Sequence, residues 1–192
     1  MILFLDNFDS FTYNLVDYFH QLGLSCEVVR NDIAPDTLDW SNYTALVISP
    51  GPGIPKTSGY LNSYLAYAIG KIPVLGICLG HQAIGEFFGA ELIKNDFPVH
   101  GKVSKVEHQN HPIFNSIPPH FEVCRYHSLQ LKNLPNTLQS IAETSDGVIM
   151  VISHTCFSAF GIQFHPEAIL TPYGLQLLDN WASLALLKKS IL

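Results

Sequence analysis

The first half of the chain alternates short apolar runs with segments of helical periodicity. The apolar runs cover residues 1–5, 45–49 and 74–77, and residues 26–29 form a further strand-like run. Continuous apolar runs of this length are typical of strands that are buried on both faces of a sheet. Strands that alternate with helices favour a mostly parallel sheet covered on both faces. We therefore predict an α/β fold with a mostly parallel central sheet and helices on both faces.

Helices are expected between these strands and at the end of the chain. The segments with helical spacing are residues 11–22, residues 59–70, a segment from residue 80 onward and a segment that starts at residue 171. Asp9 or Ser10 is predicted to cap the first helix. Thr171 is predicted to cap the last one, with Pro172 at the first helical position.

Residues 91–164 show a different pattern, in which short strand-like runs are separated by turn residues. These runs are 103–107, 121–126, 138–142, 148–153 and 160–164. Short strands at this spacing predict a smaller antiparallel addition to the sheet. No repeat or linker interrupts the 192 residues, and a chain of this length commonly forms one domain. We expect residues 1–192 to form a single domain.

The charge and cysteine patterns argue against several classes of function. Sixteen acidic and ten basic residues give a formal net charge of −6, which disfavours a nucleic-acid partner. No apolar stretch approaches the roughly 18 residues of a membrane span. Four cysteines without a C-x-x-C pair, and no signal peptide, favour a reducing, cytoplasmic setting. The histidines lack the spacing of a tetrahedral metal site, so we expect no metal in this chain. We expect no other cofactor in this chain either.

A cysteine in a tight turn between glycines is the first candidate for chemistry. In the sequence GICLGHQ, Cys78 follows the apolar run 74–77 and lies two residues from both Gly76 and Gly80. A strand, a sharp turn and a helix in this order form a nucleophile elbow, and the helix N-terminus favours a thiolate. An inert core cysteine is the alternative for this segment.

A cysteine nucleophile requires a base and a group that orients the base. The sequence QFHPE places His165 at the end of the run 160–164, with Glu167 close enough to hold the imidazole ring. Active residues of α/β sheets gather at the carboxyl ends of strands, where Cys78 also falls. His165 is therefore the candidate base, and a structural histidine beside an exposed glutamate is the alternative. His81 is a weaker candidate.

The sequence SPGPG at residues 49–53 supplies the third element of a possible site. Proline has no backbone N–H, so only the glycine N–H groups of this loop can face an anion. We predict an oxyanion hole formed by the N–H groups of Gly53 and of Leu79, the residue after the nucleophile. An ordinary rigid turn is the alternative.

The motifs PGPG, GICLGHQ, YHSL and QFHPE, in this order and at these intervals, resemble those of the class I (triad-type) glutamine amidotransferases. The resemblance runs essentially from end to end and implies a flavodoxin-like sheet. The opening LDNFDSFTYNL, the HGK at residues 100–102 and the ILT at residues 169–171 resemble one subgroup more closely. That subgroup comprises the glutaminase subunits (component II) of anthranilate synthase and aminodeoxychorismate synthase.

The resemblance implies a role for each matching residue. Cys78 would be the nucleophile, His165 the base and Glu167 its orienter. The residues implied to bind glutamine are Gly51, Pro52 and Gly53 in the oxyanion loop, and Gln82, Ser128 and Leu129 at the α-amino and α-carboxylate ends of the substrate. Ala168 departs from the family, which usually has serine after His-Pro-Glu, and this puts in doubt the hydrogen bonding around the triad.

The resemblance also implies a reaction and a partner. L-glutamine would be hydrolysed through a glutamyl thioester on Cys78, and the ammonia would pass directly to a second subunit. That subunit would be the chorismate-binding synthase subunit (component I), in a hetero-oligomer. We expect the isolated chain to be a poor glutaminase until this partner docks, with Phe8, Phe11 and the His100 segment as candidate contacts.

Three other functions stay open. A glutaminase for another synthase, such as one that makes GMP or carbamoyl phosphate, would use the same chemistry, but the DNFDSFTYN opening argues against it. A cysteine hydrolase or peptidase on a similar sheet would not need Gln82 or the Ser128 and Leu129 pair. The third is a catalytically silent interaction subunit, which the presence of all three triad residue types disfavours.

Overall fold

Five parallel strands form one half of the sheet, four from the first part of the chain and the fifth from residues 159–162. The structure is a computed structural model that describes residues 1–185, with the side chains of residues 96–100 outside the description. The parallel strands lie in the order β2–β1–β3–β4–β9, with bounds β1 Ile2–Asp6, β2 Cys26–Arg30, β3 Ala45–Ile48, β4 Val74–Ile77 and β9 Ala159–Ile162. Every residue of β1, β3, β4 and β9 is buried, which explains their continuous apolar sequences.

Four antiparallel strands extend the sheet beyond β9, in the order β9–β8–β7–β5–β6. Their bounds are β5 Glu91–His108, β6 His120–Lys132, β7 Leu138–Thr144 and β8 Ile149–His154. Both the parallel half and the antiparallel addition predicted from the sequence are thus confirmed. Strand β5 is much longer than the predicted run 103–107, because its first half is paired with β6.

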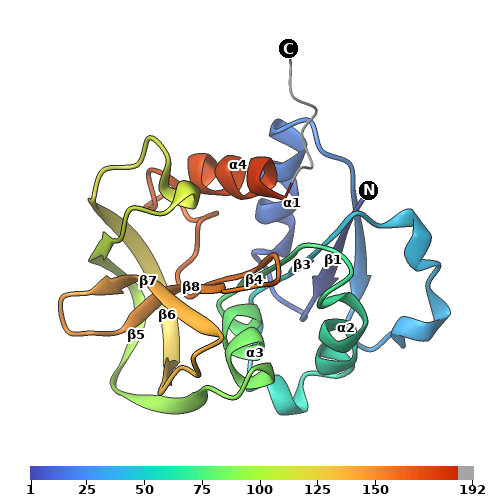
Figure 1. The fold of residues 1–192 in the computed structure, drawn as a ribbon, viewed down its shortest axis with the longest axis horizontal. Coiled ribbons are helices and arrows are strands. Elements are labelled where there is room, and N and C mark those ends of the chain that lie inside the picture. Colours follow the sequence, from blue (N-terminus) through green and yellow to red (C-terminus); the bar gives the residue numbers. More distant parts are fainter. Residues whose placement is uncertain (186–192) are drawn as a thin grey trace.

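Helices cover both faces of the parallel strands (Figure 1). Their bounds are α1 Thr12–Gln21, α2 Leu61–Ala68, α3 Leu79–Phe87 and α4 Gly174–Leu184. Helices α1 and α4 share one apolar core with the β1 side chains Ile2 and Phe4. Helices α2 and α3 share the other with Leu3 and Leu5, which point to the opposite face. No helix in the described part of the chain is long and apolar enough to cross a membrane.

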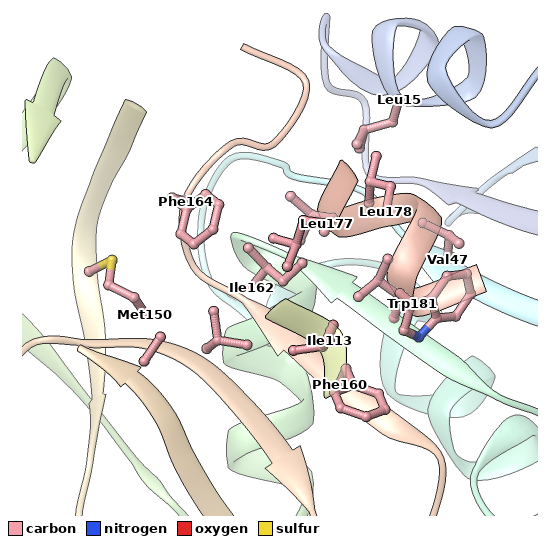
Figure 2. Packing of buried hydrophobic residues seen from close by; sticks show 14 of the residues in the cluster. Leu15, Val47, Ile113, Met150, Phe160, Ile162, Phe164, Leu177, Leu178 and Trp181 are labelled. Carbon is pink, nitrogen blue, oxygen red and sulfur yellow. The ribbon is translucent and has the colours of Figure 1, made fainter. Parts of the chain in front are cut away.

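Helix α4 closes the core on the α1 side of the sheet (Figure 2). Its residues Leu177, Leu178 and Trp181 are fully buried, and Figure 2 shows them in one cluster with the sheet residues Val47 and Ile162. This packing holds helix α4 against the sheet, and α4 follows the QFHPE segment in the chain.

The predicted helix caps are wrong at both ends of the chain. Helix α1 has Phe11 as its N-cap, and the Asp9 carboxylate accepts a hydrogen bond from the Phe11 N–H at 2.8 Å instead of capping the helix itself. Ser10 does not cap it either. Helix α4 has Tyr173 as its N-cap, because the Thr171 hydroxyl is used in the site described below. That residues 1–192 form a single domain stays a prediction.

Candidate active site

Cys78 lies in the turn between β4 and α3, in a backbone conformation that non-glycine residues rarely adopt. Its φ is 51° and its ψ is −98°, which costs on the order of 1–3 kcal/mol. Gly76 and Gly80 allow the turn: a Cβ on Gly76 would overlap the Gly80 backbone, and one on Gly80 would lie 2.7 Å from the Ile48 carbonyl oxygen. The Cys78 N–H donates to the Ile162 carbonyl at 2.8 Å and thereby ties the turn to β9. This is the geometry of a nucleophile elbow.

His165 and Glu167 follow β9 and form a buried pair. The His165 Nδ1 lies 2.6 Å from the Glu167 Oε1, and both side chains are almost inaccessible to solvent. Burial alone lowers the pKa of His165, but the interaction with Cys78, the hydrogen bond to Glu167 and the charges of both groups outweigh it and raise that pKa to about 10. We therefore expect the imidazole to carry a proton at neutral pH and to face the Cys78 sulfur as a cation.

The segment that carries His165 is held against β6 by both its main chain and its ring. The Thr171 hydroxyl donates to the His165 carbonyl at 2.8 Å and accepts from the Cys124 N–H at 3.0 Å. The rings of Phe11 and Tyr126 meet the imidazole edge to face, with centroid distances of 5.6 and 5.2 Å. Sequence patterns predicted no role in this site for Thr171 or Tyr126, although Tyr126 opens the YHSL motif.

A small pocket of about 160 Å³ opens beside Cys78. Its lining consists of Gly51, Pro52, Gly53, Cys78, Gln82, Tyr126, His127, Ser128 and Leu129. All six residues predicted to bind substrate are thus brought together around the predicted nucleophile. Larger hollows of about 410 and 510 Å³ lie along β5 and near residues 110–119, away from Cys78.

The two predicted oxyanion donors belong to the edge of this pocket. Gly53 has a φ of +80°, a left-handed conformation that suits glycine. Leu79 is the first residue of α3, so its N–H has no acceptor within the helix. Their role as an oxyanion hole stays a prediction.

Asn7 braces the loop that contains Gly53, a role that no sequence pattern indicated. Its N–H donates to the Ser49 hydroxyl and its side-chain amide to the Ser49 carbonyl, both at 2.9 Å. Its side-chain oxygen accepts from Asn31 at 2.9 Å. The DNF segment therefore supports the start of the PGPG loop from the end of β1.

His81 lies on α3 behind the nucleophile and is completely buried. Burial lowers its pKa from 6.5 to about 3, opposed in part by the nearby backbone of Gly161. Between about pH 3 and pH 6.5, His81 binds a proton in the unfolded chain but not in the folded chain. The free energy of unfolding should therefore fall as the pH falls through this range.

Replacing His81 with leucine, an apolar side chain of similar volume, should remove this titration. We expect the free energy of unfolding to fall less steeply with decreasing pH between about pH 7 and 4. The slope should decrease by on the order of 1 kcal/mol per pH unit. Urea unfolding of both proteins across this range measures the difference. Parallel pH dependences would show that His81 does not titrate on unfolding.

Comparison with known proteins agrees with this arrangement. The family model described as class I glutamine amidotransferase matches residues 3–184. The chain belongs to the class I glutamine amidotransferases. The enzyme class and the fold predicted from the sequence are thereby confirmed.

The curated relatives of this glutamine amidotransferase match it over nearly its whole length. Anthranilate synthase component 2 of Vibrio parahaemolyticus is 42% identical, with 98% of each chain covered. The aminodeoxychorismate/anthranilate synthase component 2 of Bacillus subtilis is 42% identical, with 94% of this chain and 95% of the relative covered.

Solved structures support the same fold. A protein from Thermoplasma acidophilum, described as a subunit of a putative GMP synthase, has a TM-score of 0.86 at 28% identity, over 96% of this chain and 93% of that one. A glutamine amidotransferase from Thermotoga maritima has a TM-score of 0.70 at 18% identity, over 95% and 80% of the two chains, which supports the fold alone.

Proposed function

We propose that this glutamine amidotransferase is the glutaminase subunit of a synthase that aminates chorismate, in tryptophan or folate biosynthesis. The observation that carries the proposal is the set of relatives that bear the names anthranilate synthase component 2 and aminodeoxychorismate/anthranilate synthase component 2, at 42% identity over at least 94% of both chains. The likeness to the putative GMP synthase protein is weaker, at 28% identity.

The first half of the proposed reaction forms a covalent intermediate on Cys78. The thiolate attacks the side-chain carboxamide carbon of L-glutamine, and the oxyanion accepts hydrogen bonds from the N–H groups of Gly53 and Leu79. The His165 imidazolium gives its proton to the departing nitrogen, so that ammonia leaves and a glutamyl thioester remains. Glu167 holds the ring through Nδ1.

The second half hydrolyses the thioester. The now neutral His165 takes a proton from water, and the resulting hydroxide attacks the thioester carbon. The bond from that carbon to the Cys78 sulfur breaks, which releases glutamate and restores the thiolate beside the imidazolium. No step requires a metal or an organic cofactor, and we propose that this chain uses neither.

The hydrogen bonds of Gln82 indicate which of its atoms can meet the substrate. Its side-chain nitrogen donates to the Leu129 carbonyl at 3.4 Å and to the Gln163 side-chain oxygen at 3.3 Å. Both N–H bonds are therefore directed to the protein. The Gln82 side-chain oxygen is left to accept from the α-amino group of glutamine, with Ser128 and Leu129 forming the facing wall of the pocket.

Exposed apolar residues near the site support a docked partner. Phe8 is 53% exposed just after β1, and Ile169 and Leu170 are 93% and 49% exposed just after the triad segment. Large apolar side chains exposed next to the segments that form a site fit a protein interface. We propose that the chorismate-binding subunit docks here and receives ammonia directly. The side chain of His100, another candidate contact, lies outside the described residues.

Reconstitution with a chorismate-binding synthase subunit tests the proposed function. We expect glutamine and chorismate together to yield anthranilate or aminodeoxychorismate, and glutamate release by the chain to rise when the partner is added. Ile169→Asp should weaken binding of the partner by about tenfold or more, because it places a charge in an apolar contact. Product chromatography and titration calorimetry measure the two effects.

Ile169→Leu is the matched control, since it keeps the apolar contact. Amination of a different substrate, such as the precursor of GMP, would replace the chorismate proposal with the other-synthase alternative. Rapid hydrolysis of esters or peptides in preference to glutamine would favour the cysteine hydrolase. High glutaminase turnover without any partner would contradict activation by docking.

A further inference from the structure

Gln163 is completely buried and comes directly after β9, next to the nucleophile. Ile77 and Ile162 are paired as the last residues of β4 and β9. Cys78 and Gln163 are the next residues on these neighbouring strands, so the register itself brings them together. The Gln163 side-chain nitrogen lies 3.7 Å from the Cys78 sulfur, within reach of an N–H···S hydrogen bond.

The neighbouring hydrogen bonds fix the orientation of the Gln163 amide. The Gln82 group that faces the Leu129 carbonyl must be the NH2, because a carbonyl can only accept. The same NH2 faces Gln163, which must therefore present its oxygen to Gln82. The other end of the Gln163 amide, its NH2, is then directed at the Cys78 sulfur.

The acceptor of Gln82 is held in place by contacts that lead back to Arg125, which is 6% exposed and lies on β6. A guanidinium can only donate, and its Nε donates to the His127 Nε2 at 3.0 Å. His127 therefore carries its proton on Nδ1 and donates to the Leu129 carbonyl at 2.7 Å. This carbonyl is the acceptor that orients Gln82.

We propose that Gln163 is a catalytic residue of this site, which donates a hydrogen bond to the Cys78 sulfur and stabilises its thiolate. Arg125 is a positioning residue that acts on Gln163 through His127, the Leu129 carbonyl and Gln82. The inference rests on the proposed glutaminase chemistry, in which the sulfur is an anion both before attack and when the thioester breaks. A hydrogen-bond donor directed at the sulfur stabilises the anion in both states.

The decisive variants are Gln163→Met, which keeps the length of the side chain and removes the donor, and Gln163→Glu, which places an acceptor there. We expect kcat/KM for glutamine hydrolysis to fall about tenfold or more in both. Alkylation of Cys78 by iodoacetamide should reach half its maximal rate about one pH unit higher than in the wild type. Arg125→Met should shift this profile in the same direction by a smaller amount.

Gln139→Met, at an exposed position on β7, is the matched control and should change neither measurement. Circular dichroism on each variant identifies any that does not fold. The inference about Gln163 is then tested on whichever of its two variants folds. A folded variant with the wild-type alkylation profile and turnover would overturn the inference. If Cys78→Ser also left glutamine hydrolysis intact, the proposed function itself would fail, which is a separate outcome.

Discussion

Replacing Cys78 with serine should abolish glutamine-dependent product formation by the reconstituted complex and spare product formation from added ammonia. A serine hydroxyl is a much weaker nucleophile than a cysteine sulfur, so glutamine is bound but not attacked. We expect glutamate release to fall by about a thousandfold or more, as in other enzymes that lose the nucleophile of a triad. Ammonia bypasses this chain, because its acceptor belongs to the partner.

Cys156→Ser is the matched control for this substitution, because Cys156 is an exposed free thiol. It should leave both activities unchanged. Retention of glutamine-dependent synthesis by Cys78→Ser would remove Cys78 from the role of nucleophile. Loss of both reactions in a folded, correctly assembled complex would also contradict the assignment of Cys78 as the nucleophile.

Replacing His165 with glutamine should lower kcat for glutamine hydrolysis by about 10²–10⁴-fold. Glutamine fills part of the space of the ring but can neither protonate the departing ammonia nor take a proton from water. Removing the imidazolium also removes the positive charge that faces Cys78. Steady-state assays of glutamate release measure the effect, and the ammonia-dependent reaction of the complex should be unaffected.

A double variant, Cys78→Ser with His165→Gln, distinguishes a shared mechanism from two independent effects. Residues of one catalytic unit are strongly non-additive, so the double variant should be about as slow as the slower single variant. Additive losses would indicate that the two residues act separately. His120→Gln, at an exposed position, is the matched control for the histidine substitution.

The sequence alone predicts the parallel half of the sheet closely, because its strands are buried on both faces. Strands such as β1 and β4 read as continuous apolar runs that end within a residue of the predicted positions. The turn at Cys78 follows equally well, since Gly76 and Gly80 are required by close backbone contacts. These features depend on residues that are close together in the chain, so they can be predicted from the local sequence.

Features that depend on distant partners do not follow from the sequence in this way. Residues 91–102 have no strand-like pattern, and β5 begins there only because β6 pairs with it. Thr171 reads as a helix cap, but its hydroxyl instead bonds the His165 carbonyl across the segment. Gln163 lies within the QFHPE motif, and its contact with Cys78 depends on the register of two strands far apart in the chain.

The left-handed backbone at Cys78 has an evolutionary consequence. A glycine there would relieve strain of on the order of 1–3 kcal/mol, so selection for stability alone should replace the cysteine. In descendants of this fold that no longer need the thiol, the relief of strain favours glycine, and only the buried packing of the Cys78 side chain opposes the change. A side chain kept at such a conformational cost is consistent with selection for the chemistry of its thiol.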